Sequence, residues 1–365
     1  MINLQFFPSR QVAAYMARLF VLRSFAVLFA LVIVLMTLDL LGNSGKILAY
    51  PANGDAELWK YVGLRVPQLI ARFLPFSVLL GTLITLVTLN QHSEIITMKA
   101  AGISAHQIIA PLVLAGLFIA ALNFAFNERV VTRANRALSA WEAVDYGPLP
   151  PERRVQNNVW VQHGDDLIFA RQIAGRGERL RLGPIIIYDR TGGTLRTILE
   201  AERGTRVPGG WELANVRLFH VDSGRTAQME RARLGDSLRP EQFTLAGVDP
   251  DEQDFWQLRR SIAELEAAGR PTHTIEAGLW HKIAGPLSAV LMPLLAAVAA
   301  FGLARSGQLF MRAVIGMSLG FAYFVADNFA LAMGNFGAYP PFLAAWGPFL
   351  LFLLIGEAVL IRTEE

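Results

Sequence analysis

Residues 100–127 read AAGISAHQIIAPLVLAGLFIAALNFAFN, and this stretch contains no Asp, Glu, Lys or Arg. A helix needs about 20 mostly apolar residues to span the hydrocarbon core of a bilayer. Buried helices of soluble proteins are the alternative source of such a run, but uncharged runs of this length are typical of membrane spans. The stretch therefore predicts a transmembrane helix over about residues 103–127.

Similar apolar runs recur along the chain, and Phe73–Ser93 and Ile283–Ala304 also lack all four charged residue types. The Gly and Pro residues between 334 and 341 predict a tight turn between the last two runs. Three arginines precede the first run, as in a signal peptide. However, the run exceeds a typical signal-peptide core and five spans follow, so it is predicted to be retained. The six predicted spans cover about residues 19–41, 66–89, 103–127, 279–303, 309–333 and 341–361.

The composition agrees with a membrane protein. Hydrophobic residues make up 53% of the chain and charged residues 17%, whereas soluble proteins contain about 25% charged residues. This balance excludes an ordinary soluble enzyme and also a disordered chain, which needs low hydrophobicity and high charge. The chain has no cysteine, which excludes disulfides, thiolate metal sites and a cysteine nucleophile. The net charge of +3 without a basic stripe argues against a nucleic-acid partner.

The Lys and Arg residues near the ends of the spans predict the orientation, because cytoplasmic loops carry an excess of them. An N-terminus inside the cell places more of these residues in the cytoplasm than the opposite orientation does. Both termini are therefore predicted to be cytoplasmic, and the long middle segment to be external. The cytoplasmic set is Arg10, Arg18, Arg23, Lys99, Arg305, Arg312 and Arg362, against Lys46, Lys60 and Arg65 outside.

The middle segment, residues 128–278, is polar and predicts a small antiparallel β sandwich or open barrel. Gly192-Gly193 and Pro208-Gly209-Gly210 are hairpin turn sequences, and Asp254–Ala268 has the pattern of an amphipathic helix. Open sheet edges accept a further strand from a partner, and a domain that only packs on its own helices is the alternative. The predicted strands are Val159–Gln162, Leu167–Ile173, Pro184–Asp189, Thr194–Glu202, Trp211–Val221 and Thr226–Arg231.

Recognisable catalytic motifs are absent from the sequence. There is no G-x-x-x-x-G-K-[ST] phosphate loop, and the six histidines lack metal-ligand spacings such as H-E-x-x-H. Asp327 falls deep in the fifth span, where a charge costs roughly 2.5–3.5 kcal/mol on insertion scales. Asp327 is either a hydrogen-bonded structural carboxylate or part of a functional site. Asp39 ends the first predicted span, and Arg72 lies in the second.

Six basic residues cluster in sequence near the outer ends of the first three spans. Arg129, Arg133 and Arg136 have i, i+4 and i+7 spacing, so one helix face would carry all three. Because Arg binds phosphate through paired hydrogen bonds, the cluster predicts a collar for an anionic headgroup. Ordinary interfacial arginines on a solvated helix are the alternative. The other members are Lys46, Lys60 and Arg65.

The turn between the second and third spans predicts a short cytoplasmic helix. Ser93 is its predicted N-cap and Gly102 its stop, and Glu94 lies in the first turn, where the helix dipole favours an anion. A short amphipathic helix in a chain without an ATPase motif suits docking into the groove of a partner. A plain interfacial turn is the alternative.

Three patches resemble the LptF/LptG permease family, the membrane subunits of an ABC transporter that exports lipopolysaccharide. The first is Ser93-Glu-Ile-Ile-x-Met98-x-Ala-Ala-Gly102-Ile-Ser, which resembles the coupling helix of the family. The second, Leu279–Ser288, resembles the entry into the fourth span, and the third extends from Gly316 to Pro341. Trp280 and Asp327 make the likeness closer to the LptG branch than to the LptF branch. The resemblance covers essentially the whole chain.

The resemblance implies an α-helical membrane protein of six transmembrane helices, with a periplasmic all-β, jellyroll-like domain between the third and fourth. The implied parts are residues 1–127, 128–278 and 279–365, in the bacterial inner membrane. It also implies a heterodimer with an LptF-type permease, bound to two ABC ATPase subunits that carry ATP and Mg²⁺. This chain would be non-catalytic and have no cofactor. It would extract lipopolysaccharide and pass it toward periplasmic jellyroll bridge proteins.

Site residues follow from the resemblance only where the motifs match. Glu94 would meet an arginine of the ATPase, within a coupling helix at about 93–102 that also contains Ser93, Met98 and Gly102. The family carries basic phosphate contacts on the first span, but here Met36-Thr-Leu-Asp39 occupies that stretch. We hypothesise that other cations replace them, with two carboxylates as further cavity charges. The headgroup set is then Lys46, Arg72, Arg133, Arg136, Asp39 and Asp327.

Two alternatives from other functional classes remain open at this point. A membrane-embedded hydrolase or transferase using Asp327 and a histidine predicts activity of the isolated chain. An assembly scaffold that binds partners through its β domain predicts no transport defect when charges inside the helix bundle are changed.

Overall fold

The structure is a computed structural model, which describes residues 8–148, 155–175, 180–235, 243, 249–267, 271–301 and 309–362. The chain divides into two compact units. The helical unit comprises Met1–Ser139, Pro250–Leu258 and Thr272–Glu365. The β unit comprises Ala140–Asp249 and Arg259–Pro271. Arg305 of the predicted cytoplasmic set and the last two residues of the predicted 279–303 span lie outside the described residues.

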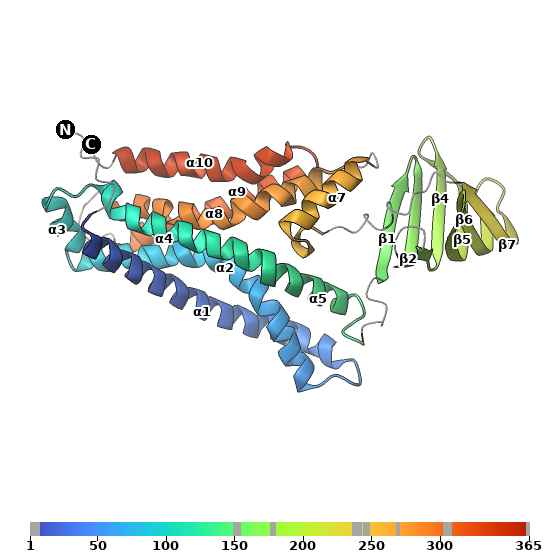
Figure 1. Ribbon diagram of the computed structural model, residues 1–365, viewed down its shortest axis with the longest axis horizontal. Helices are drawn as coiled ribbons and strands as arrows, with labels where there is room; N and C mark the ends of the chain where they lie inside the picture. Colours follow the sequence, from blue (N-terminus) through green and yellow to red (C-terminus); the bar gives the residue numbers. More distant parts are fainter. Residues whose placement is uncertain are drawn as a thin grey trace. The chain divides into compact units, whose positions relative to one another are not determined.

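Six helices of the described chain are long and apolar enough to cross a membrane, which confirms the predicted spans. They lie side by side in one bundle (Figure 1). Shorter helical segments are α3 (Glu94–Ala100), the π-helical turn η1 (Asn127–Val131), α5 (Thr132–Glu142), the 3₁₀ turn η3 (Pro250–Glu252) and α7 (Phe255–Ala267). The long helices are α1 (Arg10–Leu48), α2 (Asp55–Gln91), α4 (Ala105–Phe126), α8 (His273–Phe301), α9 (Leu309–Asn335) and α10 (Pro341–Arg362).

The two ends of the bundle are named here by the predicted orientation. The cytoplasmic end is the one at which α2 ends, α3 lies and α4 begins. The outer end is the opposite one, at which α4 ends and α8 and α10 begin.

The first two helices extend beyond the predicted spans. The helix α1 continues past Asp39 to Leu48, so the end of the first membrane span at Asp39 stays a prediction. Asp39 pairs with Arg65 of α2 at 3.1 Å. Pro67 and Pro75 lie inside α2, and proline is a common cause of helix kinks such as the bend in α2 visible in Figure 1.

Small residues allow the helices to approach closely. A Cβ atom added at Gly81 of α2 would overlap Ser24 of α1, and one added at Gly116 of α4 would overlap the carbonyl oxygen of Ala289 of α8. Association of helices in lipid depends on such close packing, because the lipid tails are as apolar as the side chains.

The β unit contains one antiparallel sheet in the order β1-β2-β3-β5-β6-β7, with β4 paired to β2 and β5. All six predicted strands are present; β3, which has only two residues, was missed because so short a segment shows no alternation. Gly192 and Gly193 adopt positive φ angles of 58° and 80° at the hairpin between β4 and β5. The strands are β1 (Val155–His163), β2 (Asp166–Ala174), β3 (Arg181–Leu182), β4 (Ile185–Thr191), β5 (Thr194–Val207), β6 (Gly210–His220) and β7 (Arg225–Gly235).

One face of the sheet carries the apolar core of the β unit, in which Trp211 packs edge to face against Phe243 at 5.5 Å. The alternation of buried and exposed residues shifts along β6, because Leu213 and Val216 are both buried. Asn215, between them, has a positive φ of 54°. Asn tolerates this left-handed conformation better than most residues, so it accommodates the shift.

Candidate functional site

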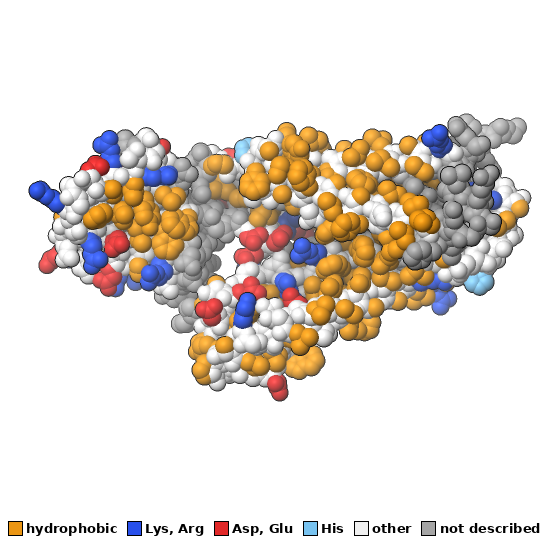
Figure 2. Space-filling model, turned by 180° about the vertical axis from the view of Figure 1, so that it is seen from behind, with side chains coloured by type: hydrophobic (Ala, Val, Ile, Leu, Met, Phe, Trp, Pro, Cys, Tyr) orange, Lys and Arg blue, Asp and Glu red, His pale blue; other side chains and the backbone are white. Residues whose placement is uncertain are grey.

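Charged side chains of both signs gather toward one end of the helical unit, beyond a surface covered with hydrophobic side chains (Figure 2). At the outer end, α1 and α2 are joined by a carboxylate with three donors. Asp39 accepts hydrogen bonds from the Tyr61 hydroxyl at 2.6 Å and from Arg65 Nε and Nη2 at 3.2 and 3.1 Å. Arg65 therefore binds Asp39 with two nitrogens of its guanidinium group, which is the strong geometry for this pair.

A second carboxylate, Glu128 in the π-helical turn η1, joins three elements. Its Oε2 accepts a hydrogen bond from the backbone N–H of Phe255, the first residue of α7, at 2.7 Å. Its Oε1 lies 3.7 Å from Lys282 Nζ of α8, and both side chains are largely buried, with 14% and 12% exposed. A negative charge at the start of α7 is also favoured by the helix dipole.

The predicted arginine collar is only partly supported by the geometry. The i, i+4, i+7 argument assumed one unbroken α-helix, but Arg129 lies in the π-helical turn and the other two in α5. A π turn changes the rotation per residue, so Arg129 does not share their face on that argument. Arg136 donates to the carbonyl oxygen of Glu252 at 2.6 Å and to Gln257 at 2.9 Å.

All four predicted headgroup cations are exposed, but they differ in their contacts. Lys46, Arg72 and Arg133 have no hydrogen bond or ion pair with any other residue that the structure describes. They therefore differ from Arg65 and Arg136, whose guanidinium groups already bind within the chain. The grouping of the predicted cations into one anion site therefore stays a prediction.

Asp327 in α9 accepts a hydrogen bond from His281 of α8, with 3.1 Å between Oδ2 and Nε2. The Asp327 side chain is 14% exposed and that of His281 30%. His281 was not among the predicted site residues, although it lies in the Leu279–Ser288 patch. The pair links two transmembrane helices, which fits the prediction of a hydrogen-bonded structural carboxylate.

At the cytoplasmic end, α3 occupies the predicted short helix. Gly102 stops it with a φ of 83°, and the N–H groups of Gly102 and Ile103 bond to the carbonyls of Lys99 and Met98. These two bonds form a Schellman motif. The predicted capping role of Ser93 is wrong. Ser93 has a φ of 60° and its hydroxyl makes no capping bond, because the left-handed backbone at this residue does not provide the extended geometry of an N-cap.

The side chains of α3 divide between the bundle and the surface. Ile95 is buried and Ile96 is 61% exposed, while Met98 is half-buried. Glu94 accepts a hydrogen bond from the hydroxyl of Tyr15 in α1 at 3.3 Å. This hydrogen bond connects α3 with the first transmembrane helix. It could not be predicted from the sequence, because the two residues lie far apart in the chain.

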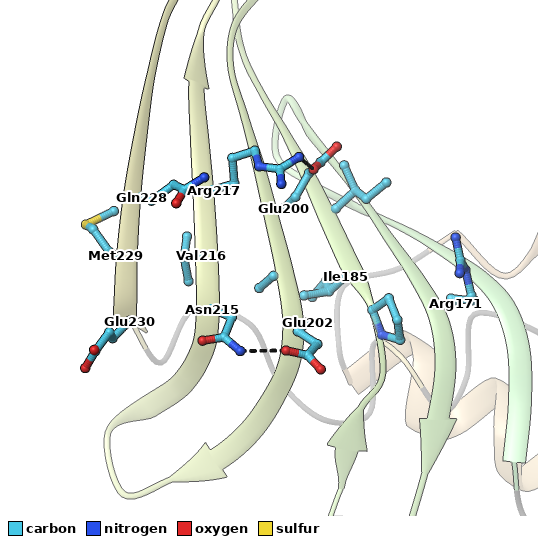
Figure 3. A pocket seen from close by; sticks show the side chains of 13 residues that line it. Arg171, Ile185, Glu200, Glu202, Asn215, Val216, Arg217, Gln228, Met229 and Glu230 are labelled. Carbon is cyan, nitrogen blue, oxygen red and sulfur yellow. Dashed lines mark hydrogen bonds and ion pairs between the residues drawn. The ribbon is translucent and has the colours of Figure 1, made fainter.

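The β unit has a hollow of about 600 Å³ across β4 to β7 (Figure 3). Its charged lining is partly paired within itself: Asn215 donates to Glu202 at 2.6 Å, and Arg217 lies 3.5 Å from Glu200. Glu230 on β7 belongs to the same lining. Among the described residues, no group of three or more His, Cys, Asp or Glu could hold a metal ion.

A sequence model of the lipopolysaccharide export system permease family LptF/LptG matches residues 14–362. The chain belongs to this family. Lipopolysaccharide export system permease protein LptG of Escherichia coli strain K12 is 26% identical over 310 residues, which cover 83% of this chain and 84% of the relative. LptG of Haemophilus influenzae is 25% identical over 332 residues, covering 86% and 88%.

Family membership identifies the chain as a multi-pass permease subunit for lipopolysaccharide transport and supports neither the hydrolase nor the scaffold alternative. The proximity of Asp327 and His281 does not by itself support an enzymatic role, because a structural hydrogen bond between two helices explains why these side chains lie together.

Proposed function

We propose that this chain extracts lipopolysaccharide from the inner membrane and passes it to a periplasmic bridge, as one permease of an ATP-driven transporter. The observation that carries the proposal is the family match from residue 14 to residue 362. The six membrane-spanning helices and the antiparallel sheet between α5 and α8 are the architecture that this function requires.

The proposed topology places both termini in the cytoplasm and the β unit, as a jellyroll, in the periplasm. Residues 1–127 and 279–365 form the membrane part, and residues 128–278 are inserted between the third and fourth spans. The excess of Lys and Arg on the predicted cytoplasmic side supports this orientation.

The proposed partners are a second, LptF-type permease and two ABC ATPase subunits, which bind and hydrolyse ATP with Mg²⁺. The helix α3 would dock on one ATPase, and Glu94 would meet an arginine there. The exposure of Ile96 beside the buried Ile95 supports docking, because it leaves an apolar side chain on the outside of α3.

The headgroup phosphates of the lipid would bind the exposed cations Lys46, Arg72 and Arg133. Arg136 and Asp39 would contribute through position, since Arg136 holds α5 against η3 and α7 and Asp39 holds α2 against α1. Asp327, paired with His281, would line the cavity wall rather than bind phosphate, because a carboxylate repels an anion.

The β unit would carry the acyl chains along its apolar face and connect to a periplasmic bridge protein of similar fold. Val216, on that face, pairs in register with Met229 of β7, which is 41% exposed. The strand β7 pairs only with β6 among the described strands, so its second edge is open to β-augmentation.

The proposed mechanism is mechanical. Closure of the ATPases on ATP would move α3, and this movement would narrow the lipid cavity. Lipid is released upward only if it binds the open cavity more tightly than the closed one.

A mild-detergent pull-down of the tagged chain from its native membrane, with mass spectrometry of protein and lipid, tests the proposal. We expect a second permease, an ABC ATPase and lipopolysaccharide in one complex. A chain recovered with neither ATPase nor glycolipid would contradict it. In reconstituted vesicles, Glu94→Ala should leave the complex folded but uncouple ATP hydrolysis from export. Thr97→Ala on the same helix is the matched control and should export normally.

A further inference from the structure

Exposed aromatic side chains gather at the outer end of the helical unit. Phe336 is 82% exposed, Phe342 51% and Tyr339 41% around the turn between α9 and α10. Trp280 of α8 stands edge to face with Phe342 at 5.3 Å. In α7, Trp256 is 64% exposed. Aromatic groups exposed together in this way mark a surface that meets lipid or another molecule.

The lengths of the helices place these residues at the edge of the hydrocarbon layer. Pro341–Arg362 contains 22 residues, which at 1.5 Å per residue span about 33 Å. The hydrocarbon core is about 30 Å thick. The apolar 22-residue segment of α9 likewise ends at Asn335. Residues 336–342 therefore lie just beyond the hydrocarbon, at the level of the headgroups.

The start of α7 is held at the same level. Glu128 lies 23 residues past Ala105, about 35 Å along a helix that continues to Glu142, and its carboxylate accepts the N–H of Phe255 at 2.7 Å. Trp256 is the next residue of α7 and therefore lies within one residue of this contact. The depth of Trp256 is thus set by this contact with the helix that begins at Ala105.

The composition of α7 fits a headgroup layer. Trp256, Arg259, Arg260, Ala263 and Glu264 are exposed with i, i+3, i+4, i+7 and i+8 spacing, so they form one face that carries both charge signs. The opposite face is buried through Leu258, Ile262 and Leu265. Trp is enriched at membrane interfaces, where its ring meets the acyl boundary and its N–H meets water.

We propose that Trp256, Trp280 and the aromatic residues of the 336–342 turn lie in the headgroup layer of the outer leaflet, and that α7 begins as an interfacial helix. Lipid accounts for the pattern better than a docked protein does, because the residues come from three separate elements and share a depth. These aromatic residues set the depth at which the helix bundle lies in the bilayer. This inference does not depend on the cargo.

The absence of cysteine from the chain makes its membrane depth directly measurable, because one introduced cysteine carries one spin label. We would label Trp256→Cys in the full chain, reconstituted in nanodiscs of phosphatidylethanolamine and phosphatidylglycerol. Leu354→Cys in α10, 69% exposed in the middle of a span, is the hydrocarbon control. Arg225→Cys, exposed at the start of β7, is the water control. The measurement is the ratio of collision rates with oxygen and with a water-soluble nickel chelate.

The label at position 256 should give a ratio between those of the two controls, at the value of a phosphate-level lipid label. A ratio equal to that at position 225 would place Trp256 in water and overturn the proposal. Protection from both probes would show that protein covers the residue, and would overturn it as well.

A second measurement leaves the tryptophan in place. Lipids brominated near the headgroup end of the acyl chain quench nearby tryptophan fluorescence. Trp256→Phe should lower the quenchable share of the total emission. Trp160→Phe in β1, where Trp160 is 49% exposed, should not. Equal quenching before and after Trp256→Phe would contradict the interfacial placement. Both measurements use neither cargo nor ATPase, so their failure would be separate from any failure of the transport function.

Discussion

The two ends of the helical unit use similar polar pairs in different surroundings. At the outer end, Glu128 and Lys282 meet with 14% and 12% of their side chains exposed. At the cytoplasmic end, His106 and Glu357 lie 3.5 Å apart but are 40% and 41% exposed, and Tyr15, bonded to Glu94, is 46% exposed. A buried pair is costly to break, whereas an exposed one is exchanged easily for a partner or water. The pair at the outer end is therefore suited to hold the helices together, and the pairs at the cytoplasmic end are suited to exchange partners.

The largest effect is expected from separating Glu128 and Lys282. Lys282→Met leaves the carboxylate largely buried without its cation, and breaking one side of a buried pair costs about 3–5 kcal/mol of unfolding free energy. Thermal unfolding in detergent measures this loss. Glu128→Gln/Lys282→Met removes both charges and should recover most of the stability. A double variant as unstable as the single one would show that the pair is not what holds α4, α7 and α8 together.

A smaller loss is expected at Asp39. Asp39→Asn removes the charge that holds Arg65 and Tyr61, and hydrogen bonds to charged groups contribute about 1.5–3 kcal/mol. The partial exposure of both side chains, 18% for Asp39 and 33% for Arg65, puts the expected loss near the lower figure. The same variant removes the negative charge beside Arg65 Nε and Nη2, so binding of a phosphate-bearing lipid should strengthen. Unchanged stability together with unchanged lipid binding would remove Asp39 from the structural and cavity roles assigned to it.

The next smaller loss of stability is expected at the Asp327–His281 pair. Asp327→Asn keeps a side chain that can hydrogen bond with His281 but removes the charge. We expect a loss of stability below that of Asp39→Asn, since a neutral hydrogen bond remains worth about 1 kcal/mol. Asp327→Ala, which removes the bond altogether, should cost more. Equal melting temperatures for the two variants would show that charge and not hydrogen bonding is what Asp327 contributes.

Periodicity and composition predicted the large elements because each span and strand is long enough to show its own pattern. The ends of α1 and α2 were not predictable in this way. The helices continue beyond their apolar runs, and the apolar pattern alone does not show where a helix that leaves the bilayer ends. The π turn at Asn127–Val131 was not predicted, because such turns are rare and no residue pattern separates this one from the α-helix around it.

The candidate site was also predictable only where its residues are close together in the sequence. The motif around Glu94 could be found because its residues are consecutive, and Gly102 could be identified as a stop by residue type. The contact of Glu94 with Tyr15 could not be predicted. It could also not be predicted which cations bind other residues of the chain and which do not. Arg65 and Arg133 look alike in sequence, but only Arg65 has a carboxylate opposite it.

The smallest change in stability and the most informative one for coupling is expected from Tyr15→Phe. The hydroxyl is exposed and its bond to Glu94 is 3.3 Å long, so its removal should change the unfolding free energy by less than about 0.5 kcal/mol. If Glu94 exchanges Tyr15 for an arginine of the ATPase, the variant loses a competitor and the ATPase should bind slightly more tightly. The signal from α3 to α1 would weaken at the same time. We therefore expect ATP hydrolysis at the normal rate or above it, with less lipid exported per ATP, measured in reconstituted vesicles. Tyr50→Phe, on the segment between α1 and α2, is the matched control. Normal export per ATP by Tyr15→Phe would mean that α3 acts on the bundle through its helix connections alone.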